Sequence, residues 1–153
     1  MPDKASYPPS AFHFKVTFDG INTAADSSFQ EVSGIGATLE TEPVKEGGEN
    51  DMVYRMPKNV SFPKLELKRG IAALDSELVS WCEDCILHFR TRKIKPKLVY
   101  VRLLNEEGTV LHGWSFANAI PVEWQMGAFN AQKNEVALET LKLEYSYWER
   151  ERI

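Results

Sequence analysis

The stretch LVYVRLL at residues 98–104 decides the fold, because a turn, NEEG (105–108), and a returning stretch, TVLHGWSF (109–116), follow it directly. Short apolar runs separated by turns that contain Gly or Asn are typical of neighbouring antiparallel strands. Two later segments, 120–125 and 134–147, continue this pattern. The last third of the chain therefore predicts one β-meander.

The segment 134–147 changes the phase of its apolar alternation. Its large apolar residues fall on even positions up to Leu138 and on odd positions from Leu141 onward. Successive side chains on a strand point to opposite faces, so this change needs a structural cause. One interpretation is a β-bulge near Glu139 and Thr140, which would bend the strand and suit a sheet that curls toward a barrel. The other is a strand with both faces buried, the second one against another subunit.

The size and composition are those of a single globular domain spanning residues 1–153. The chain has 43% hydrophobic and 26% charged residues and a net charge of -4, which favours neither nucleic acid nor an anionic membrane as a partner. No apolar run approaches the ~20 residues of a membrane span, so no membrane anchoring is expected. The N-terminal residues MPDKAS lack the apolar core of a secretory signal, which predicts synthesis in a cytoplasm without a signal peptide.

The first third predicts a lead-in and two strands. Prolines give residues 1–9 an extended, flexible character. Residues 12–18 alternate strictly between apolar and polar side chains, which predicts a half-buried strand. Residues 29–35 predict a second strand, in which Gly34 and Gly36 mark a bend or a place where another backbone comes close.

The middle of the chain contains an expected exposed loop. The stretch PVKEGGEN at 43–50 has little to pack and two adjacent glycines, so we predict a flexible loop there. Strand character returns at residues 52–56, before Pro57, and again at 64–68. Such a loop either is a solvated hairpin tip or carries function on a rigid scaffold.

One helix is predicted, over about residues 75–89, with a cap at Asp75 or a neighbour. The basic residues at 90–97 follow its end, where positive charge is favourable next to the helix dipole. They lack the interleaved aromatic residues of a nucleic-acid platform, so we expect no specific nucleic-acid site. The apolar stripe of the helix has three- and four-residue spacing and consists of Leu74, Leu78, Trp81, Cys82, Cys85 and Phe89.

Cys82 and Cys85 are the only cysteines, in a C-x-x-C spacing. The pair could be redox-active or form half of a zinc site. A second ligand pair is missing, and no strand precedes the helix as in thioredoxin-like sites. We therefore interpret both cysteines as helix packing.

The sequence contains no recognisable catalytic motif. His13, His88 and His112 fall on different predicted elements, and no zinc-hydrolase, nucleophile-elbow or phosphate-loop pattern occurs. We predict no catalytic, cofactor-binding or metal site, and hence no enzyme. The aromatic residues exceed what one small barrel interior readily holds and favour an interface; they are Trp114, Trp124, Trp148, Tyr100, Tyr145 and Tyr147.

Several stretches together resemble the tail tube protein family of contractile phage tails and bacterial contractile injection systems. Their order and spacing cover about 140 residues, although no single motif is decisive. They are YPP (7–9) with the strand 12–18, FQEVSG (29–34), LKRG (67–70), LLNEE (103–107), WSFANAIPV (114–122) and NEVALETL (134–141).

The resemblance implies a mainly β fold with one flanking helix, either a β-barrel or a two-sheet sandwich. It implies that six copies form a ring and that rings stack into a hollow tube inside a contractile sheath. The expected partners are the chain itself, sheath, baseplate or spike-hub proteins, and DNA or protein cargo in the lumen. The protein would be part of a phage tail or injection particle assembled in a bacterium.

The resemblance also assigns a role to the loop. By position, it matches the family segment that contacts the neighbouring ring, so the ring-stacking residues are expected to be Glu46, Gly47, Gly48, Glu49 and Asn50.

Two alternatives remain open. The ending, residues 143–150, is more aromatic than the trunk-tube pattern, and some family members are tube initiators between a spike-hub and the trunk. A different class of function is a monomeric β-barrel that carries a small ligand between aromatic walls.

Overall fold

The meander predicted for the last third of the chain is present in the computed structural model, which describes residues 12–22, 24–45, 53–71, 76–128, 132 and 137–152. In chain order, these residues form β1 (His13–Phe18), the 3₁₀ helix η2 (Ala24–Ser27), β2 (Ser28–Phe29), β3 (Glu31–Ser33), β4 (Thr38–Lys45), β5 (Val53–Ser61), β6 (Leu65–Gly70), α1 (Glu77–Ile86), β7 (Lys97–Leu104), β8 (Val110–Met126), β9 (Leu138–Glu144) and β10 (Tyr147–Arg150).

Strand β8 is the spine of the meander. It is one strand of 17 residues, although the sequence predicted two segments there. It pairs with β7 on one side and with β10 and then β9 on the other. Asn118 has a positive φ of 54°, and the register shifts between Pro121 and Glu123, so β8 bends without losing its pairing.

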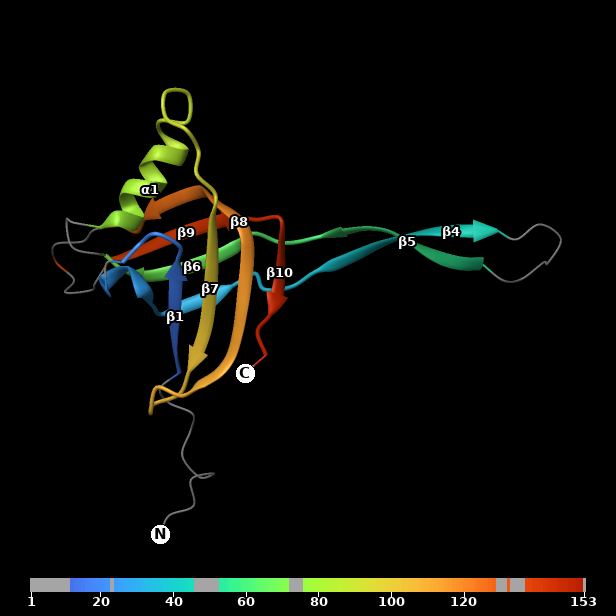
Figure 1. The fold of residues 1–153 in the computed structure, drawn as a ribbon, viewed down its shortest axis with the longest axis horizontal. Coiled ribbons are helices and arrows are strands. Elements are labelled where there is room, and N and C mark those ends of the chain that lie inside the picture. The colour runs from blue at the N-terminus through green and yellow to red at the C-terminus, as the bar shows by residue number, and fades with distance from the viewer. Residues whose placement is uncertain are drawn as a thin grey trace, which may run out of the picture.

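The sheet closes into a barrel. Its order is β2-β1-β7-β8-β9-β6-β3, and β2 and β3 are consecutive pieces of one segment that joins the two ends. Within that segment, the amide of Gln30 donates to the carbonyl of Lys68 at 2.8 Å. Helix α1 packs at one end of this barrel, as Figure 1 shows. The mainly β architecture with a single helix is confirmed for the described residues.

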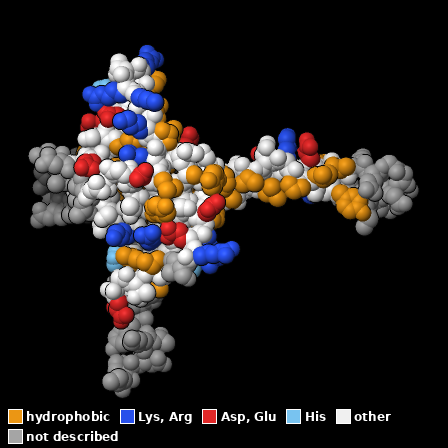
Figure 2. Space-filling model, in the orientation of Figure 1, with side chains coloured by type: hydrophobic (Ala, Val, Ile, Leu, Met, Phe, Trp, Pro, Cys, Tyr) orange, Lys and Arg blue, Asp and Glu red, His pale blue; other side chains and the backbone are white. Residues whose placement is uncertain are grey.

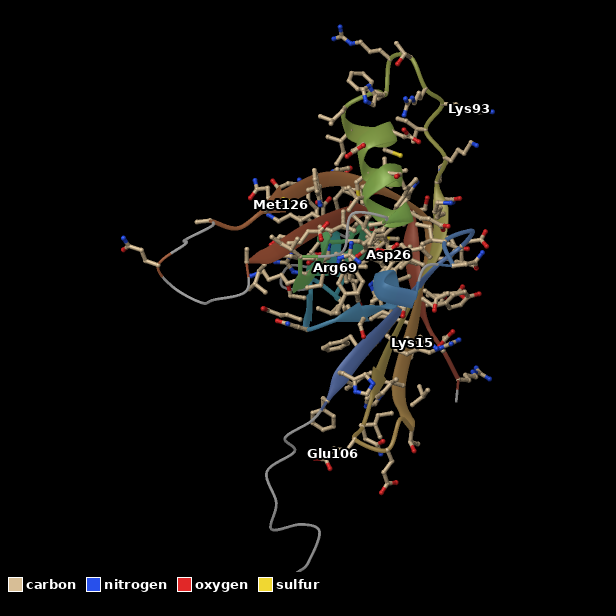
Figure 3. All side chains as sticks on the ribbon, turned by 90° about the vertical axis from the view of Figure 1, so that its left-hand side faces the viewer. Lys15, Asp26, Arg69, Lys93, Glu106 and Met126 are labelled. Atoms are coloured by element: carbon tan, nitrogen blue, oxygen red, sulfur yellow. The ribbon has the colours of Figure 1, made fainter. Side chains whose placement is uncertain are left out.

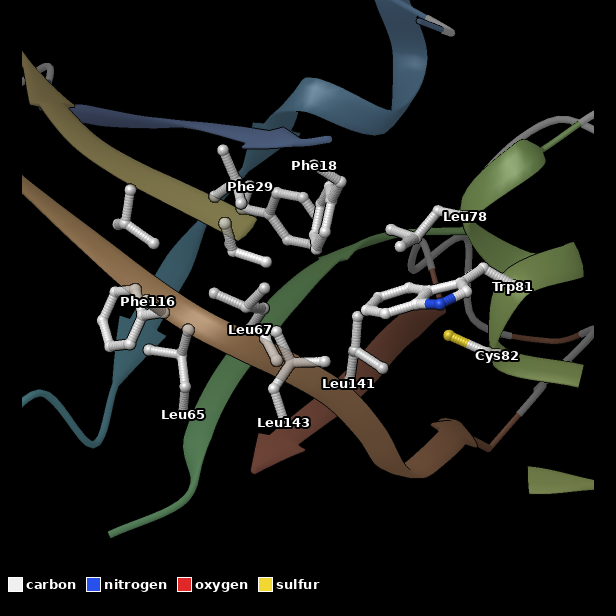
Figure 4. Close-up of a cluster of buried hydrophobic side chains, with 14 of the residues drawn as sticks. Phe18, Phe29, Leu65, Leu67, Leu78, Trp81, Cys82, Phe116, Leu141 and Leu143 are labelled. Atoms are coloured by element: carbon white, nitrogen blue, oxygen red, sulfur yellow. The ribbon is translucent and has the colours of Figure 1, made fainter. Parts of the chain in front are cut away.

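The barrel interior is a packed hydrophobic core (Figure 4). Phe18 is buried in this core, with its ring centroid 6.2 Å from that of Phe29 and 5.9 Å from that of Trp81. Trp81 belongs to α1, so the helix caps the barrel with an aromatic side chain. The alternation predicted for residues 12–18 is confirmed from residue 13 to 18, where Val16 and Phe18 are buried while His13, Lys15 and Thr17 are exposed, but Phe12 is 48% exposed and lies outside the core.

Helix α1 is shorter than predicted. Ser76 is its N-cap and accepts a hydrogen bond from the amide of Val79 through its hydroxyl oxygen. The helix ends at Ile86, so Phe89 lies in the following turn and is 52% exposed instead of completing the apolar stripe. Cys82 and Cys85 face the core, as expected for packing residues. Leu74 and Asp75 lie outside the described residues.

The predicted β-bulge near Glu139 and Thr140 is wrong. Strands β9 and β6 keep one continuous register, from Leu65 opposite Leu143 to Gly70 opposite Leu138. The phase changes because Leu138 points outward, 41% exposed, whereas Glu139 occupies an inward position and is 4% exposed. The apparent irregularity is therefore a buried carboxylate in a regular strand.

Candidate assembly interface

Strands β4 and β5 form a two-stranded hairpin that extends away from the barrel (Figure 1). We call this hairpin, residues 38–61, the arm. Its strands pair from Thr38 opposite Ser61 to Lys45 opposite Val53, with one register shift next to Glu40. It forms a sheet separate from that of the barrel.

The arm is longer than the sequence predicted. Residues 43–45 belong to β4, although they were expected to begin the loop, and β5 continues through Pro57 to Ser61. Prolines argue against a central strand, but each strand of a two-stranded ribbon has one unpaired edge, where proline is tolerated. The β-branched and aromatic residues of VYRMPKNVS were the available signal for this strand.

The arm exposes large hydrophobic side chains. Every described side chain from Thr38 to Val44 and from Tyr54 to Ser61 is exposed. Figure 2 shows hydrophobic side chains running along the arm and onto the adjacent barrel surface. The largest of them are Leu39, Val44, Tyr54, Met56 and Val60, which are 38% to 54% exposed. An isolated hairpin is only marginally stable in water, and exposed apolar surface of this kind marks an interaction site.

The C-terminal aromatic residues hold the base of the arm. The indole nitrogen of Trp148 donates to the carbonyl of Gly36 at 2.7 Å, next to the start of β4. The Tyr145 hydroxyl donates to the carbonyl of Pro63 at 2.8 Å, just beyond the end of β5. The direction in which the arm leaves the barrel is thereby fixed on both of its strands.

Gly34 allows two backbone segments to approach closely near the base of the arm. It has a φ of +89°, and a Cβ atom there would lie 2.0 Å from the carbonyl oxygen of Lys64. The predicted close approach of another backbone at this glycine is therefore confirmed.

The surplus of aromatic residues is largely used within the chain. Trp114, Trp124, Tyr145 and Trp148 are partly buried and pack against the hydrophobic core, so part of their surface is already covered within the chain. The barrel surface consequently offers fewer aromatic contacts to a partner than the sequence suggested. The exposed apolar residues of the arm are the stronger signal for assembly.

The predicted ring-stacking residues connect the two arm strands. Glu46, Gly47, Gly48, Glu49 and Asn50 lie outside the described residues, as does the lead-in at 1–9. Strand β4 ends at Lys45 and β5 begins at Val53, so these residues belong to the segment that joins the outer ends of the arm strands.

A buried polar cluster around Arg69 is the only grouping in the described chain that has the look of a chemical site (Figure 3). Arg69 donates to Asp26 at 2.7 Å and to Glu139 at 3.1 Å. The Ser76 hydroxyl donates to Asp26 at 2.6 Å, and the indole nitrogen of Trp124 donates to Glu139. The cluster ties η2, β6, β9 and the start of α1 together.

This cluster is structural. Burial disfavours the charged form of Asp26, but hydrogen bonds from Ser76 and Arg69 outweigh it and lower the pKa of that carboxyl group. Arg69 and Glu139 are each at most 4% exposed, so a substrate has no route to them. Among the described residues, no buried side-chain polar atom lacks a hydrogen-bond partner. The cluster thus has no group available for chemistry.

The cysteines are suited to packing. Both are unbridged and buried on the core side of α1. Burial raises the pKa of Cys82 to about 12 and also raises the pKa of Cys85. Reactive cysteines have lowered pKa values, so this environment opposes redox chemistry.

The described part of the chain shows neither a metal site nor a membrane-spanning helix. No group of three or more His, Cys, Asp or Glu side chains there has an arrangement that could hold a metal ion. No described helix has the length and apolar character needed to cross a membrane.

A ligand-carrying barrel is not supported. The interior is filled by side chains such as Leu67, Val99 and Phe116, which are all 0% exposed. A carrier needs a concave, largely preformed cavity for its ligand.

Comparison with known proteins agrees with an assembly role. The family described as T4-like virus tail tube protein gp19 matches residues 10–149. No curated protein matches the chain.

Solved structures resemble the chain over nearly its whole length. A chain of the anti-feeding prophage baseplate, solved with six-fold symmetry, is 31% identical; it has a TM-score of 0.72, and the match covers 95% of this chain and 96% of that one. A chain of the PVC sheath–tube complex is 22% identical with a TM-score of 0.74, covering 97% and 95%. Hcp1 from Salmonella typhimurium is 13% identical with a TM-score of 0.55, covering 92% and 85%.

Proposed function

Because this chain belongs to the T4-like virus tail tube protein family, we propose that six copies form a ring and that rings stack into the hollow inner tube of a contractile injection particle. The chain is thus a tail tube protein. Six-fold symmetry was applied to the baseplate structure that contains the 31% identical relative, which supports a six-membered ring here. Closed symmetry is also the usual form of self-assembling proteins.

The exposed arm is the observation that carries this proposal. The barrel has its own filled core, whereas the arm has five large hydrophobic side chains at least 38% exposed and no second layer among the described residues. Covering the arm with neighbouring copies removes this apolar surface from water. This burial stabilises the assembly by about 25 cal/mol for each Å² of apolar surface. In a monomer the apolar side chains of the arm stay in water, whereas in a ring they become buried and stabilise the contact between copies.

The segment beyond the arm strands supplies the contact between rings in this proposal. Glu46, Gly47, Gly48, Glu49 and Asn50 join strands that extend far from the barrel, which suits a contact with another layer. The role of the chain is architectural, without catalysis. Its surroundings are sheath and baseplate proteins outside and cargo inside the lumen, in keeping with the sheath–tube and baseplate assemblies of its relatives.

A deletion tests this proposal. Removing residues 46–50 joins Lys45 to Asp51 and leaves two residues before Val53, a length that closes a β-hairpin. We expect single rings but no tubes by negative-stain electron microscopy. A control that keeps the length and replaces Glu46, Glu49 and Asn50 by Ser separates loop chemistry from loop length. Tubes of normal length from the deletion variant would refute the stacking role.

Electron microscopy of the unmodified protein separates a trunk subunit from a tube initiator. A trunk subunit forms long tubes by itself, whereas an initiator stops at single rings until its hub is present. The aromatic ending does not favour the initiator, because Tyr145 and Trp148 are occupied with the arm base.

A further inference from the structure

An apolar groove lies where the end of α1 and the turn after it pass over β8. Its volume is about 230 Å³. Its walls include Ile86, Phe89, Ile94, Ile120 and Val122, and no charged side chain lines it. Phe89 and Ile94 are 52% and 38% exposed, so the groove keeps bulky apolar side chains in contact with water.

Basic residues flank Phe89 and Ile94 of this groove in the sequence, and we call them its rim. Arg90, Lys93 and Lys95 lie in the turn between α1 and β7, and all three are exposed. Figure 2 shows Lys and Arg side chains gathered at this end of the molecule, and Figure 3 places Lys93 in the turn beyond α1. Arg92 is paired with Asp84, but in the described part of the chain no ion pair is present for the other three. The protein as a whole has a net charge of -4, so this rim is a local exception.

The segment that joins the arm strands has the opposite chemistry. Residues 46–52 read EGGENDM, with carboxylates at Glu46, Glu49 and Asp51, no basic residue and one apolar side chain, Met52. Methionine is unbranched and adapts to irregular apolar gaps. We call this segment the arm tip and use only its sequence.

We propose that the arm tip of one copy docks into the α1 groove of another copy. Met52 enters the groove, and the three carboxylates face Arg90, Lys93 and Lys95. This inference rests on the proposed function and names the receptor for the ring-stacking segment. The occupant comes from a second copy because the arm extends away from α1 in Figure 1. Complementary charge of this kind sets the register and orientation of a contact and weakens as salt rises.

The test is a binding measurement that does not need tubes. The probe is a fluorescein-labelled peptide of residues 44–54. The recipient is the full chain with Glu46→Gln, Glu49→Gln, Asp51→Asn and Met52→Ser, whose own tips lack both the carboxylates and the apolar side chain, so its grooves stay open with either rim. We expect saturable binding by fluorescence anisotropy, weakened about tenfold by adding Arg90→Glu, Lys93→Glu and Lys95→Glu to the recipient, because several charge pairs are lost together.

Two controls make the result specific. A peptide with Glu46→Lys, Glu49→Lys and Asp51→Lys regains affinity for the rim-reversed recipient, whereas a peptide with Met52→Ser loses affinity for both recipients. A recipient with Lys15→Glu, Lys58→Glu and Lys64→Glu carries the same charge change at exposed sites outside the groove and binds the unmodified peptide as before. Circular dichroism verifies that every recipient is folded.

The opposing results are distinct. Absence of peptide binding, or binding that the rim reversal leaves unchanged, overturns the docking proposal. Binding of the unmodified chain to phosphatidylglycerol vesicles, with no peptide binding, identifies the groove as a membrane contact and also overturns it. If the 46–50 deletion abolishes tubes but the affinity of the peptide is unchanged by the rim reversal, the ring-stacking role of the segment is supported and only its proposed docking site at α1 is wrong.

Discussion

The barrel and the arm of this protein satisfy the same physical demands in opposite ways. The barrel buries Phe116, Leu67 and Val99 completely within its own strands. The arm is also made of paired strands, yet Met56 and Val60 are more than half exposed. Both regions therefore contain strands paired within the chain, although each arm strand keeps one unpaired edge, but only the barrel buries its apolar side chains within the chain. A region whose strands are paired but whose large apolar side chains stay exposed is expected to bind a partner.

Breaking the polar cluster around Arg69 should have the largest effect on the barrel. Arg69→Met leaves Asp26 and Glu139 buried without their guanidinium partner. Loss of one partner from a buried ion pair costs about 3–5 kcal/mol, so urea unfolding should detect this loss. The matched arm variant, Arg55→Met, changes an exposed residue and should stay within about 0.5 kcal/mol. Equal losses of unfolding free energy in the two variants would contradict the proposed difference between the barrel and the arm.

Truncating one apolar residue in each region should sharpen the comparison. Phe116→Ala in the core should cost about 3–5 kcal/mol of unfolding free energy. Met56→Ala in the arm should leave that quantity within about 0.5 kcal/mol in unassembled protein. It should instead raise the concentration needed for assembly about tenfold, which corresponds to about 1.4 kcal/mol, as measured by light scattering. A folding defect without an assembly defect in Met56→Ala would place the arm with the barrel.

Acid should weaken the barrel through Asp26. Its pKa in the folded state lies below the unfolded value of about 3.9, so its stabilising contribution is complete above that value. The contribution disappears as the pH falls through the folded-state pKa. We therefore expect Asp26→Asn to be less stable than the unmodified protein at pH 7, by about 1–3 kcal/mol. Urea titrations at pH 7, 5 and 3 should show the gap narrowing only below about pH 4, whereas a gap constant with pH would exclude this linkage.

Loosening the joint between the two regions should have the smallest effect. Trp148→Phe keeps an aromatic ring but removes the hydrogen bond to the carbonyl of Gly36, which is worth about 1 kcal/mol. We expect a small decrease in the thermal midpoint and faster proteolysis within β4 and β5. Tyr147→Phe is the matched control, since its side chain is 49% exposed on the same strand. Equal proteolysis of the two variants would show that Trp148 does not hold the arm.

Local pattern was sufficient for the barrel strands and insufficient for the contacts between them. The alternation at 12–18 and the apolar run at 98–104 predicted β1 and β7. In a half-buried strand, buried and exposed positions follow one another directly along the chain, so the pattern is visible in a short stretch of sequence. Glu139 could not be placed in this way. Its partner Arg69 is 70 positions away, so an inward carboxylate looked like a break in the pattern.

The candidate interface was predicted only in part. The sequence was sufficient to predict the polar character of residues 46–50 and their position between two strands. It did not predict the length of the arm, because Pro43 and Pro57 are residues typical of strand ends but lie within the paired strands. The roles of Tyr145 and Trp148 depend on partners 82 and 112 positions away. Contacts at such separations leave no local signature, and only the folded chain brings them together.

Hydrogen–deuterium exchange of the same protein, first as dispersed single copies and then in assembled rings or tubes, tests the division most directly. The account predicts that amides of β4 and β5 exchange rapidly in single copies and become at least about tenfold more protected on assembly, while those of β7 remain unchanged. Equal protection of the arm in both states would show that it is stable without neighbours and would contradict the account.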